Sequence, residues 1–295
     1  MGDNKRICKM ADTMLPAIRT LWMECFGDDE AYVDFYFREY REGRTTWVLK
    51  EERIAGMVSE MTCELVRKGA RYPLRYQYAG GVAPEFRGRG LFPELMRQRR
   101  EEAAAHDEAV IFEPGPGLFE YYRRMGYRDL FPVKEYSFET EAGRTLSLME
   151  TSGLRRAEPE DYLRVRDSFF TGDGYVKWGL PHIRYAIAEC ELAGGGAYYT
   201  GGTTGGDGGL WSARLPHIAL VGGIMDGELQ VKEAMIPDES LKEELSELAA
   251  VFSCSRVSVR LPEWSSLPGI LREFGVGYGP HTEGMERPYL NLTLD

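Results

Sequence analysis

The chain has 295 residues, of which 36 are Lys or Arg and 47 are Asp or Glu, so its formal net charge is −11. A general nucleic-acid binder is disfavoured, because phosphate neutralisation requires an excess of basic side chains. The length and a hydrophobic content of 43% favour two globular domains, each with its own core. The N-terminal residues lack the apolar stretch of a secretory signal, and no uncharged run reaches the length of a membrane span.

The cysteines and histidines exclude further classes of protein. The five cysteines are scattered without a CxxC pair, and no two of the four histidines are four residues apart. This pattern disfavours both a disulfide framework and a zinc site. We therefore expect a reduced, cytoplasmic protein without a metal site; the sequence leaves its oligomeric state open.

The first half of the chain predicts a mixed sheet with helices on both faces. Apolar residues at three- and four-residue steps indicate helices, and alternating β-branched and aromatic residues between turn residues indicate strands. The expected order is two helices, three strands, a helix, a strand, a helix and the closing strands. The first two helices are expected at 12–26 (with Asp12 as N-cap) and 30–40, and the three strands that follow at 45–50, 54–66 and 75–82. A helix is then expected at 91–105, a strand at 109–112, a helix at 118–125 and the closing strands at 127–138.

The second half repeats the pattern of the first. LRRAEPEDYLRVRD, which begins at Leu154, parallels RICKMADTMLPAIR, which begins at Arg6. LREFGV aligns with YRRMGY, so that Leu271 stands where Tyr122 stands in the first copy. An internal repeat of about 150 residues fits this better than two unrelated domains. We expect one domain at residues 1–140, a linker at 141–153 and a second domain at 154–295.

A glycine-rich stretch interrupts the second copy. Residues 194–209 contain nine glycines in GGGAYYTGGTTGGDGG. A phosphate cradle is conceivable, but no Lys-Ser or Lys-Thr follows as in a P-loop. A flexible surface loop is the expected structure.

The segment YAGGVAPEFRGRGL, residues 78–91, is the most informative part of the sequence. A strand ends at Val82, Pro84 stops its ladder, and Gly88 and Gly90 permit a turn directly before a helix. Such a junction aims backbone N–H groups and the positive end of a helix dipole at one spot, which favours an anion such as pyrophosphate. Residues 87–100 add five arginines against one glutamate. The alternative is a glycine turn followed by a solvated basic helix face.

The motif Arg87-Gly88-Arg89-Gly90-Leu91-Phe92 resembles the acetyl-CoA loop of the GNAT superfamily of N-acetyltransferases, R/Q-x-x-G-x-G/A, with Phe92 in place of the last small residue. FEYYRRMGYRDL, at residues 119–130, is similar to the family's late helix and strand, and the resemblance covers residues 6–139 in element order. The two-copy layout resembles the enhanced-intracellular-survival-type acetyltransferases without their third domain. The resemblance implies an α/β fold (an α+β mixed sheet) of two tandem GNAT-type domains.

The second copy is expected to be degenerate and noncatalytic. Asp238 and Glu239 begin its helix where the first copy has glycines and arginines. These acids would repel the pyrophosphate that a helix N-terminus otherwise attracts. Leu271 in place of Tyr122 would also remove the acid that the family uses.

The resemblance also implies roles for individual residues. The backbone of residues 87–91 would hold the pyrophosphate of acetyl-CoA, and the strand at 80–82 would pair with the pantetheine arm, helped by a bulge at Gly80 and Gly81. Tyr122 would protonate the departing thiolate; the alternative is a core aromatic. The implied acetyl-CoA contacts are Gly80, Gly81, Val82, Ala83, Arg87, Gly88, Arg89, Gly90, Leu91 and Phe92.

The general base and the acceptor site are less determined. Glu113, at the end of a strand, is the best-placed carboxylate by element order, although a solvated strand-end acid is an equal alternative. Glu60 and Glu64 share one face of the preceding strand. The aromatic stripe at residues 31–40 offers Tyr32 and Tyr36 as acceptor contacts, with Asp34 and Glu39 alongside to suit a cationic amine. The alternative for this stripe is core packing.

The resemblance implies an acetyl-CoA-dependent N-acetyltransferase that acts on a primary amine of a small molecule or peptide, with no nucleic-acid or membrane partner. A noncatalytic acyl-CoA-binding or regulatory module is the alternative. A dinucleotide or nucleotide-sugar site is disfavoured, because the chain lacks a G-x-G-x-x-G pattern with a following strand-end acid.

Overall fold

The computed structural model describes residues 6–51, 53–140, 154–200 and 216–294. The expected linker at 141–153 and part of the glycine-rich stretch lie outside these ranges. The chain divides into two compact units. Unit 1 comprises Met1–Leu130 and Phe274–Met285, with Leu294, and unit 2 comprises Phe131–Glu273 and Glu286–Thr293.

Unit 1 is built on a mixed sheet in the order β1-β2-β3-β4-β5-β14-β6. The long hairpin of β3 and β4 is antiparallel, whereas β4 and β5 run parallel. The sheet is therefore mixed, as the sequence predicts. The strands are β1 (Arg6–Lys9), β2 (Arg44–Lys50), β3 (Ile54–Arg67), β4 (Ala70–Val82), β5 (Ala109–Phe112), β6 (Arg128–Leu130) and β14 (Gly275–Tyr278).

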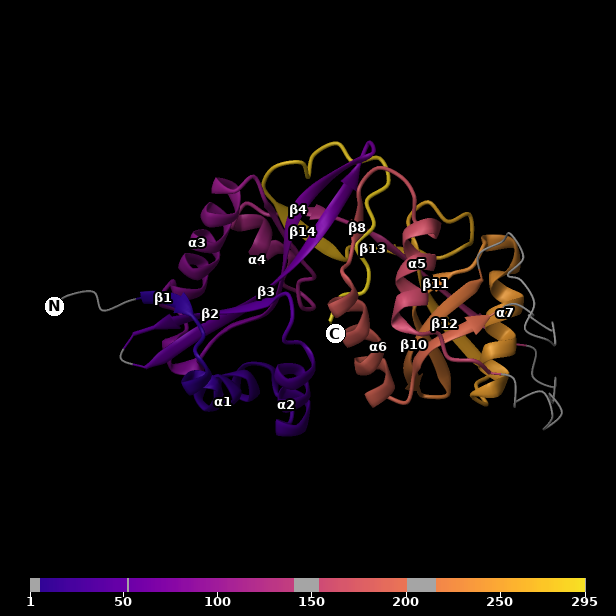
Figure 1. The fold of residues 1–295 in the computed structure, drawn as a ribbon, viewed down its shortest axis with the longest axis horizontal. Coiled ribbons are helices and arrows are strands. Elements are labelled where there is room, and N and C mark those ends of the chain that lie inside the picture. The colour runs from indigo at the N-terminus through magenta and orange to yellow at the C-terminus, as the bar shows by residue number, and fades with distance from the viewer. Residues whose placement is uncertain (1–5, 52, 141–153, 201–215, 295) are drawn as a thin grey trace. The chain divides into compact units, whose positions relative to one another are not determined.

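Four helices flank the sheet of unit 1, with α1 (Leu15–Phe26) and α2 (Glu30–Glu39) on one face and α3 (Leu91–Ala105) and α4 (Phe119–Arg124) on the other (Figure 1). The helical spacing of α1 buries Ile18, Leu21 and Trp22 against the sheet. Asp12 is not the cap of this helix. It opens a short 3-10 turn, Asp12–Met14, and the α-helix begins at Leu15.

Unit 2 contains a second mixed sheet in the order β13-β7-β12-β11-β10-β9. Helix α7 lies on one face of this sheet, and α5 and α6 lie on the other (Figure 1). Val221, Val231 and Val257 from the strands and Leu241 and Leu245 from α7 belong to one buried core. The elements are β7 (Val133–Glu139), α5 (Pro159–Phe169), β8 (Tyr175–Lys177), α6 (Leu180–Leu192), β9 (Gly196–Thr200), β10 (His217–Met225), β11 (Glu228–Met235), α7 (Asp238–Val251), β12 (Arg256–Pro262) and β13 (Ile270–Arg272).

The internal repeat is visible in the topology. In unit 2, antiparallel β10 and β11 are followed by α7 and then by β12, which runs parallel to β11. In unit 1, antiparallel β3 and β4 are followed by α3 and parallel β5. The alignment of Leu271 with Tyr122 is wrong, however. Leu271 belongs to strand β13 and its surface is 52% exposed, whereas Tyr122 is buried in helix α4.

The two units divide the chain differently from the expected domains, because each sheet contains a strand from the other half of the sequence. Strand β7 pairs with β12 along seven residues, so that the segment expected to close the first domain belongs to unit 2. Strand β14 lies between β5 and β6 in unit 1. Gly277 permits this close approach, because a Cβ there would lie 2.4 Å from Leu130 Cδ1.

The glycine-rich stretch is not a surface loop over its described part. Gly196–Thr200 form β9, in which Ala197 and Tyr198 are 2% and 4% exposed. A Cβ on Gly195 would lie 2.0 Å from the Val221 carbonyl oxygen, so this glycine allows the chain to pass against β10. Residues 201–209 lie outside the described residues.

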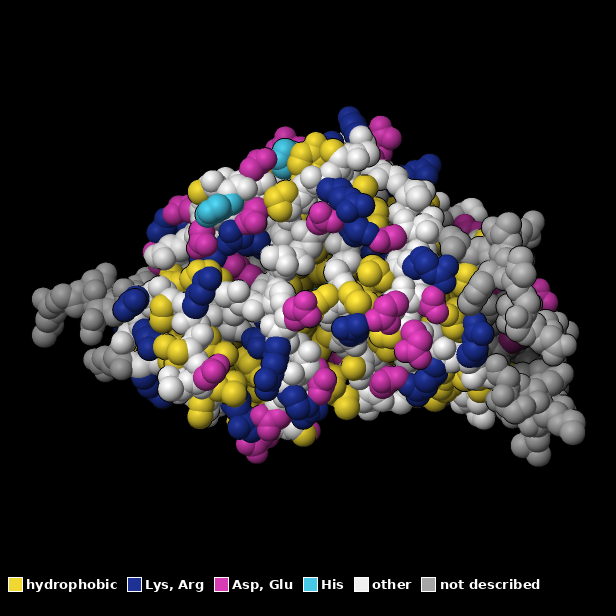
Figure 2. Space-filling model, in the orientation of Figure 1, with side chains coloured by type: hydrophobic (Ala, Val, Ile, Leu, Met, Phe, Trp, Pro, Cys, Tyr) yellow, Lys and Arg dark blue, Asp and Glu magenta, His cyan; other side chains and the backbone are white. Residues whose placement is uncertain are grey.

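On the face drawn in Figure 2, basic and acidic side chains are interspersed over the surface. Many of them form ion pairs, such as Arg97 with Glu94 and Glu101. No helix among the described residues is both long and apolar enough to span a bilayer.

Candidate active site

The sheet of unit 1 forks between β4 and β5. The two strands pair in parallel from Leu74 with Ala109 to Tyr76 with Ile111, and this register does not continue beyond Tyr76. Strand β4 runs on to Val82 while still paired with β3 on its other side. The last residues of β4 therefore present a strand edge toward the opening between the two strands.

A β-bulge bends β4 within this fork. Ser59 pairs with Tyr78 and Met57 pairs with Gly81, so Ala79 and Gly80 together oppose Val58 alone. Ala79 has a positive φ of 50°. The expected bulge is thus present one residue earlier than Gly80 and Gly81, and a bulge is a common device for redirecting a strand beside a site.

The backbone of Val82 faces away from β3. The Ala83 N–H donates to the Ala55 carbonyl on β3 at 2.9 Å, and successive residues of a strand direct their peptide groups to opposite sides. Consistent with this, the Val82 carbonyl accepts a hydrogen bond from Arg87 Nε at 3.1 Å. The Val82 N–H is therefore directed into the fork.

Gly80, in the bulge, and Gly81, directly after it, leave room for neighbouring side chains. A Cβ on Gly81 would lie 2.9 Å from Cys25 Sγ, and one on Gly80 would lie 3.2 Å from the ring of Phe92. The Phe92 ring thus fills the space beside Gly80 that a small residue would leave open. Its centroid lies 6.3 Å from that of Tyr122.

The loop before α3 owes its shape to Gly88 and Gly90, whose φ angles are 73° and 72°. A Cβ at either position would meet nothing within 4 Å, so these glycines serve the left-handed backbone rather than close packing. Gly90 is the N-cap of α3, with no side chain capping the helix. The first turn of a helix leaves N–H groups without acceptors inside the helix, which makes this end of α3 suitable for an anion.

Two of the five arginines of residues 87–100, Arg99 and Arg100, pack into the fold and do not belong to the loop. Arg99 is 2% exposed and binds Glu60 with its Nε and Nη2 at 3.1 and 3.0 Å. Arg100 lies over the rings of Tyr127 and Tyr278, at 4.9 and 4.4 Å from their centroids. Only Arg87 and Arg89 belong to the loop itself, and Arg89 forms an exposed ion pair with Glu51 at 2.7 Å.

Tyr122 lies on α4, packed against the end of β5. Its ring centroid is 4.6 Å from that of Phe112, and the residue is 7% exposed. Burial, followed by the neighbouring Tyr121, raises the pKa of Tyr122 above its ordinary value. The phenol therefore keeps its proton at neutral pH, as a proton donor must.

The three candidate carboxylates occupy different surroundings. Glu113 follows β5 directly and is partly exposed. Glu60 is 6% exposed and accepts hydrogen bonds from Arg99, Gln77 and Trp47. Both carboxylate oxygens therefore belong to a buried hydrogen-bond network, and Glu60 is unsuited to act as the general base. Glu64 lies 3.6 Å from Arg71 in an exposed pair.

The aromatic stripe of α2 divides into an accessible and a buried part. Tyr36 is 0% exposed and packs against Trp22, so it is a core residue in this structure. Tyr32 is partly exposed, and its hydroxyl lies 3.2 Å from that of Tyr78, one residue before the bulge. The carboxylates expected to attract a cation form ion pairs of their own: Asp34 with Arg19 at 2.8 Å and Glu39 with Arg38 at 2.6 Å.

Sequence reasoning missed Tyr78 and Cys25 as residues of this region. Tyr78 precedes the two glycines in the same motif, so its place in the strand was a usable signal. No spacing rule links Cys25 to Gly81, since the contact joins α1 to β4.

Unit 2 has the same fork but fills it with protein. Strands β11 and β12 pair up to Val231 with Val259, and the register does not continue. The buried residues 289–293 lie beside β11 there, with Asn291 Nδ2 donating to the Lys232 carbonyl at 2.6 Å. Glu233, 0% exposed, stands four residues before Pro237, as Gly80 stands before Pro84. The second copy is therefore degenerate.

The comparison with known protein families also distinguishes unit 1 from unit 2. The model of the acetyltransferase (GNAT) domain family matches residues 6–129. No curated protein sequence matches the chain.

Solved structures resemble the chain over both units. A probable N-acyltransferase from Enterococcus faecalis is 15% identical with a TM-score of 0.69, over 94% of this chain and 73% of that chain. A GCN5-related N-acetyltransferase from Kribbella flavida is 19% identical with a TM-score of 0.65, over 92% and 71%. Eis1 from Mycobacterium abscessus is 14% identical with a TM-score of 0.65, over 92% and 72%. At these identities the likeness concerns the fold. The family match identifies residues 6–129 as a GNAT acetyltransferase domain.

Proposed function

We propose that unit 1 binds acetyl-CoA and transfers its acetyl group to a primary amine of a small molecule or peptide. The fork between β4 and β5 carries this proposal, since it joins a strand edge, a loop shaped by Gly88 and Gly90, and a protonated Tyr122. Acetyl-CoA supplies the thioester and the acetyl group.

The residues of the fork fit the parts of acetyl-CoA. The N–H groups at the start of α3, with Arg87 and Arg89, suit the pyrophosphate, and the open space at Gly88 and Gly90 leaves the backbone accessible. The free edge of β4 from Gly80 to Val82 suits the amides of the pantetheine arm, which bind as an added strand would.

The protein contributes charge stabilisation and proton transfer to the reaction. The Val82 N–H stabilises negative charge on the carbonyl oxygen under attack, and Tyr122 gives a proton to the leaving sulfur. Glu113, just beyond β5, is our candidate to take the proton of the attacking ammonium, directly or through water.

For the acceptor side we propose Tyr32 together with Tyr78. Their hydroxyls lie 3.2 Å apart beside the bulge of β4, where they can orient an amine without a dedicated carboxylate. Tyr36 supports this wall from the core, because its ring lies 5.7 Å from that of Tyr78.

Acetyl-CoA is expected to raise the melting temperature, whereas ATP and NAD are not, because only acetyl-CoA combines the pyrophosphate with a strand-pairing arm. At 100 times its dissociation constant a ligand stabilises the folded state by about 2.7 kcal/mol. Differential scanning fluorimetry with the three nucleotides checks this expectation. Absence of CoA binding at millimolar concentration in a calorimetric titration would refute the site.

Gly90→Asp is expected to abolish CoA binding while the protein stays folded. The carboxylate would lie at the N-cap of α3, where a pyrophosphate would meet its negative charge. Gly90→Asn is the matched control, because asparagine has nearly the same size, adopts positive φ readily and carries no charge. Calorimetric affinities for CoA should therefore fall in the order parent, Asn, Asp. Equal affinity in the parent and the Asp variant would show that the loop is only a turn.

A further inference from the structure

The side chain of Arg87 turns back from the loop before α3 to the end of β4. Its Nε donates to the Val82 carbonyl oxygen at 3.1 Å. The carbonyl and the N–H of one strand residue lie on the same edge of the strand, so the contact is made on the edge that directs the Val82 N–H into the fork. The guanidinium therefore lies beside the N–H group that stabilises the oxyanion in the proposed reaction.

A short 3-10 turn, Pro84–Phe86, brings Arg87 to this position. The Arg87 N–H donates to the Pro84 carbonyl at 3.2 Å and closes the turn. Phe86 is 9% exposed and anchors the turn in the core. The chain thus folds back on itself within five residues, and the arginine reaches the end of the strand that precedes it.

The Arg87 bond replaces one that a neighbouring strand would make. The register of β4 with β5 ends at Tyr76, so the last residues of β4 have no strand partner on the edge that faces the fork. On the other edge, the Ala83 N–H donates to the Ala55 carbonyl of β3. The guanidinium therefore holds Val82 on the edge where β5 no longer does.

The same side chain also interacts with α1 through Cys25. Burial raises the pKa of the Cys25 thiol, and a hydrogen bond with the Arg87 side chain acts in the opposite direction. Cys25 is itself packed on the strand, since a Cβ on Gly81 would lie 2.9 Å from its Sγ. Arg87 thus joins the loop, the last two residues of β4 and the end of α1.

The two arginines of the loop differ in their surroundings. Arg87 is directed to the fork, whereas Arg89 forms an exposed ion pair with Glu51, in the turn between β2 and β3. The backbone N–H groups at the start of α3 remain available to an anion. A change of the Arg87 side chain therefore acts first on the end of β4.

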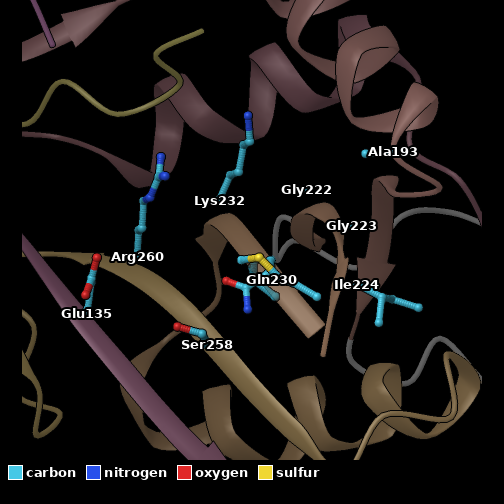
Figure 3. Close-up of a pocket in the computed structure, with 11 residues that line it drawn as sticks. Glu135, Ala193, Gly222, Gly223, Ile224, Gln230, Lys232, Ser258 and Arg260 are labelled. Carbon is cyan, nitrogen blue, oxygen red and sulfur yellow. The ribbon is translucent and has the colours of Figure 1, made fainter. Parts of the chain in front are cut away.

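Unit 2 has a serine at the corresponding place. Ser240 stands three residues after Pro237, as Arg87 stands after Pro84, and its hydroxyl donates to the Pro237 carbonyl at 3.4 Å. The pocket of unit 2 in Figure 3 lies earlier along the sheet, since the β11 residues that line it end at Lys232. The arginine accompanies the open fork of unit 1, whereas the filled fork of unit 2 has a short hydroxyl side chain.

We propose that Arg87 is a positioning residue for acetyl transfer, which holds the end of β4 so that the Val82 N–H stays directed at the reacting carbonyl group. The inference rests on the proposed function of unit 1. A donor that is already oriented requires no reorganisation when negative charge develops on the substrate oxygen. Its orientation therefore affects the rate of the reaction more than the affinity for CoA.

Arg87→Met tests this role, because methionine keeps an unbranched stem and removes the donors. The residue is exposed, so the variant should fold. We expect kcat to fall roughly tenfold or more, less than the loss of about 100-fold or more that follows removal of an oxyanion donor itself. The dissociation constant of CoA, measured by calorimetry, should rise by less than about threefold, the scale of an exposed charge.

Two further variants separate position from charge. Arg97→Met, on the exposed face of α3, removes the same charge and should leave kcat and CoA affinity within about twofold of the parent. Arg87→Lys keeps a cation and a donor, so its kcat should lie between those of the parent and Arg87→Met. A parental kcat in Arg87→Met, or a loss of CoA affinity at least as large as the loss in kcat, would overturn the inference. Equal losses in the Lys and Met variants would contradict the role of the donor.

Hydrogen exchange of the peptide that contains residues 78–83 gives a readout that does not depend on turnover. The Ala83 N–H is bonded to Ala55, so its protection reports whether the end of β4 stays on β3. Exchange should be faster in Arg87→Met than in the parent and unchanged in Arg97→Met. Unchanged exchange in Arg87→Met would contradict the inference even if acetyl transfer is found. If the parent acetylates no amine, the proposed function fails and the role in acetyl transfer fails with it, whatever the exchange shows.

Discussion

Replacing Tyr122 by phenylalanine is expected to lower the turnover rate by roughly 100-fold or more, the usual scale for a positioned proton-transfer group. The substitution removes only the hydroxyl, so the packing of the ring against Phe112 and Phe92 remains. CoA affinity and the melting temperature should change little. Steady-state rates, calorimetry and thermal melts of parent and variant check the three expectations.

Tyr121→Phe is the matched control, because Tyr121 is the adjacent tyrosine on α4 and is partly exposed. Its rate should stay near that of the parent. The pH profile adds a second readout. Because burial raises the pKa of Tyr122, the tyrosine keeps its proton, and its ionisation should not lower the parental rate below about pH 10, the ordinary value for tyrosine. A near-parental rate in Tyr122→Phe would make this tyrosine a core residue and leave the mechanism without its acid.

The second large effect concerns the stability of unit 2. Glu233→Gln is expected to lower the free energy of unfolding by about 3 to 5 kcal/mol, the usual cost of breaking a buried ion pair. Glu233 and Arg166 are both 0% exposed, and Arg166 Nε donates to Glu233 Oε2 at 2.9 Å. Tyr162 donates to the same oxygen at 2.7 Å. Glutamine would leave the guanidinium charge buried without its counter-ion.

Urea unfolding followed by tryptophan fluorescence measures this loss, since Trp178 lies in the same buried region of unit 2. Glu228→Gln serves as the control, because Glu228 is on the same strand, lies 4.0 Å from the exposed Arg256, and accepts from Gln230 a hydrogen bond that the amide oxygen of glutamine can also accept. It should change stability by less than about 0.5 kcal/mol. The double variant Arg166→Met with Glu233→Leu should recover much of the loss, because no charge is then buried. An unchanged unfolding curve in Glu233→Gln would contradict this account of the pair.

Much of the fold could be predicted because its signals are local. The run of helix-forming residues in α3 and the short apolar run of β5 predicted the limits of these elements to the residue, Leu91–Ala105 and Ala109–Phe112. The exchange of β7 and β14 could not be predicted, because strand pairing between segments more than 100 residues apart leaves no period in the sequence. The glycine that permits it, Gly277, looks the same in sequence as a turn glycine.

The candidate site shows the same limit. The loop glycines were predictable because a positive φ favours glycine, and the structure gives Gly88 and Gly90 that conformation. The arginines of α3 were harder to place, since a count of charges does not show which face of the helix each one occupies. Arg99 and Arg100 turn toward the sheet, and Tyr36 turns from the expected acceptor wall into the core.

The most direct test of acetyl transfer in unit 1 is a turnover assay with acetyl-CoA and a broad panel of primary amines. It follows free thiol by a colour reaction and the acetylated amine by mass spectrometry, in the parent and in Gly90→Asp. The account predicts that at least one amine raises thiol release in the parent, with one acetylated product per thiol, and that Gly90→Asp abolishes both. Thiol release that no amine stimulates, or acetylation that continues unchanged in Gly90→Asp, would contradict it.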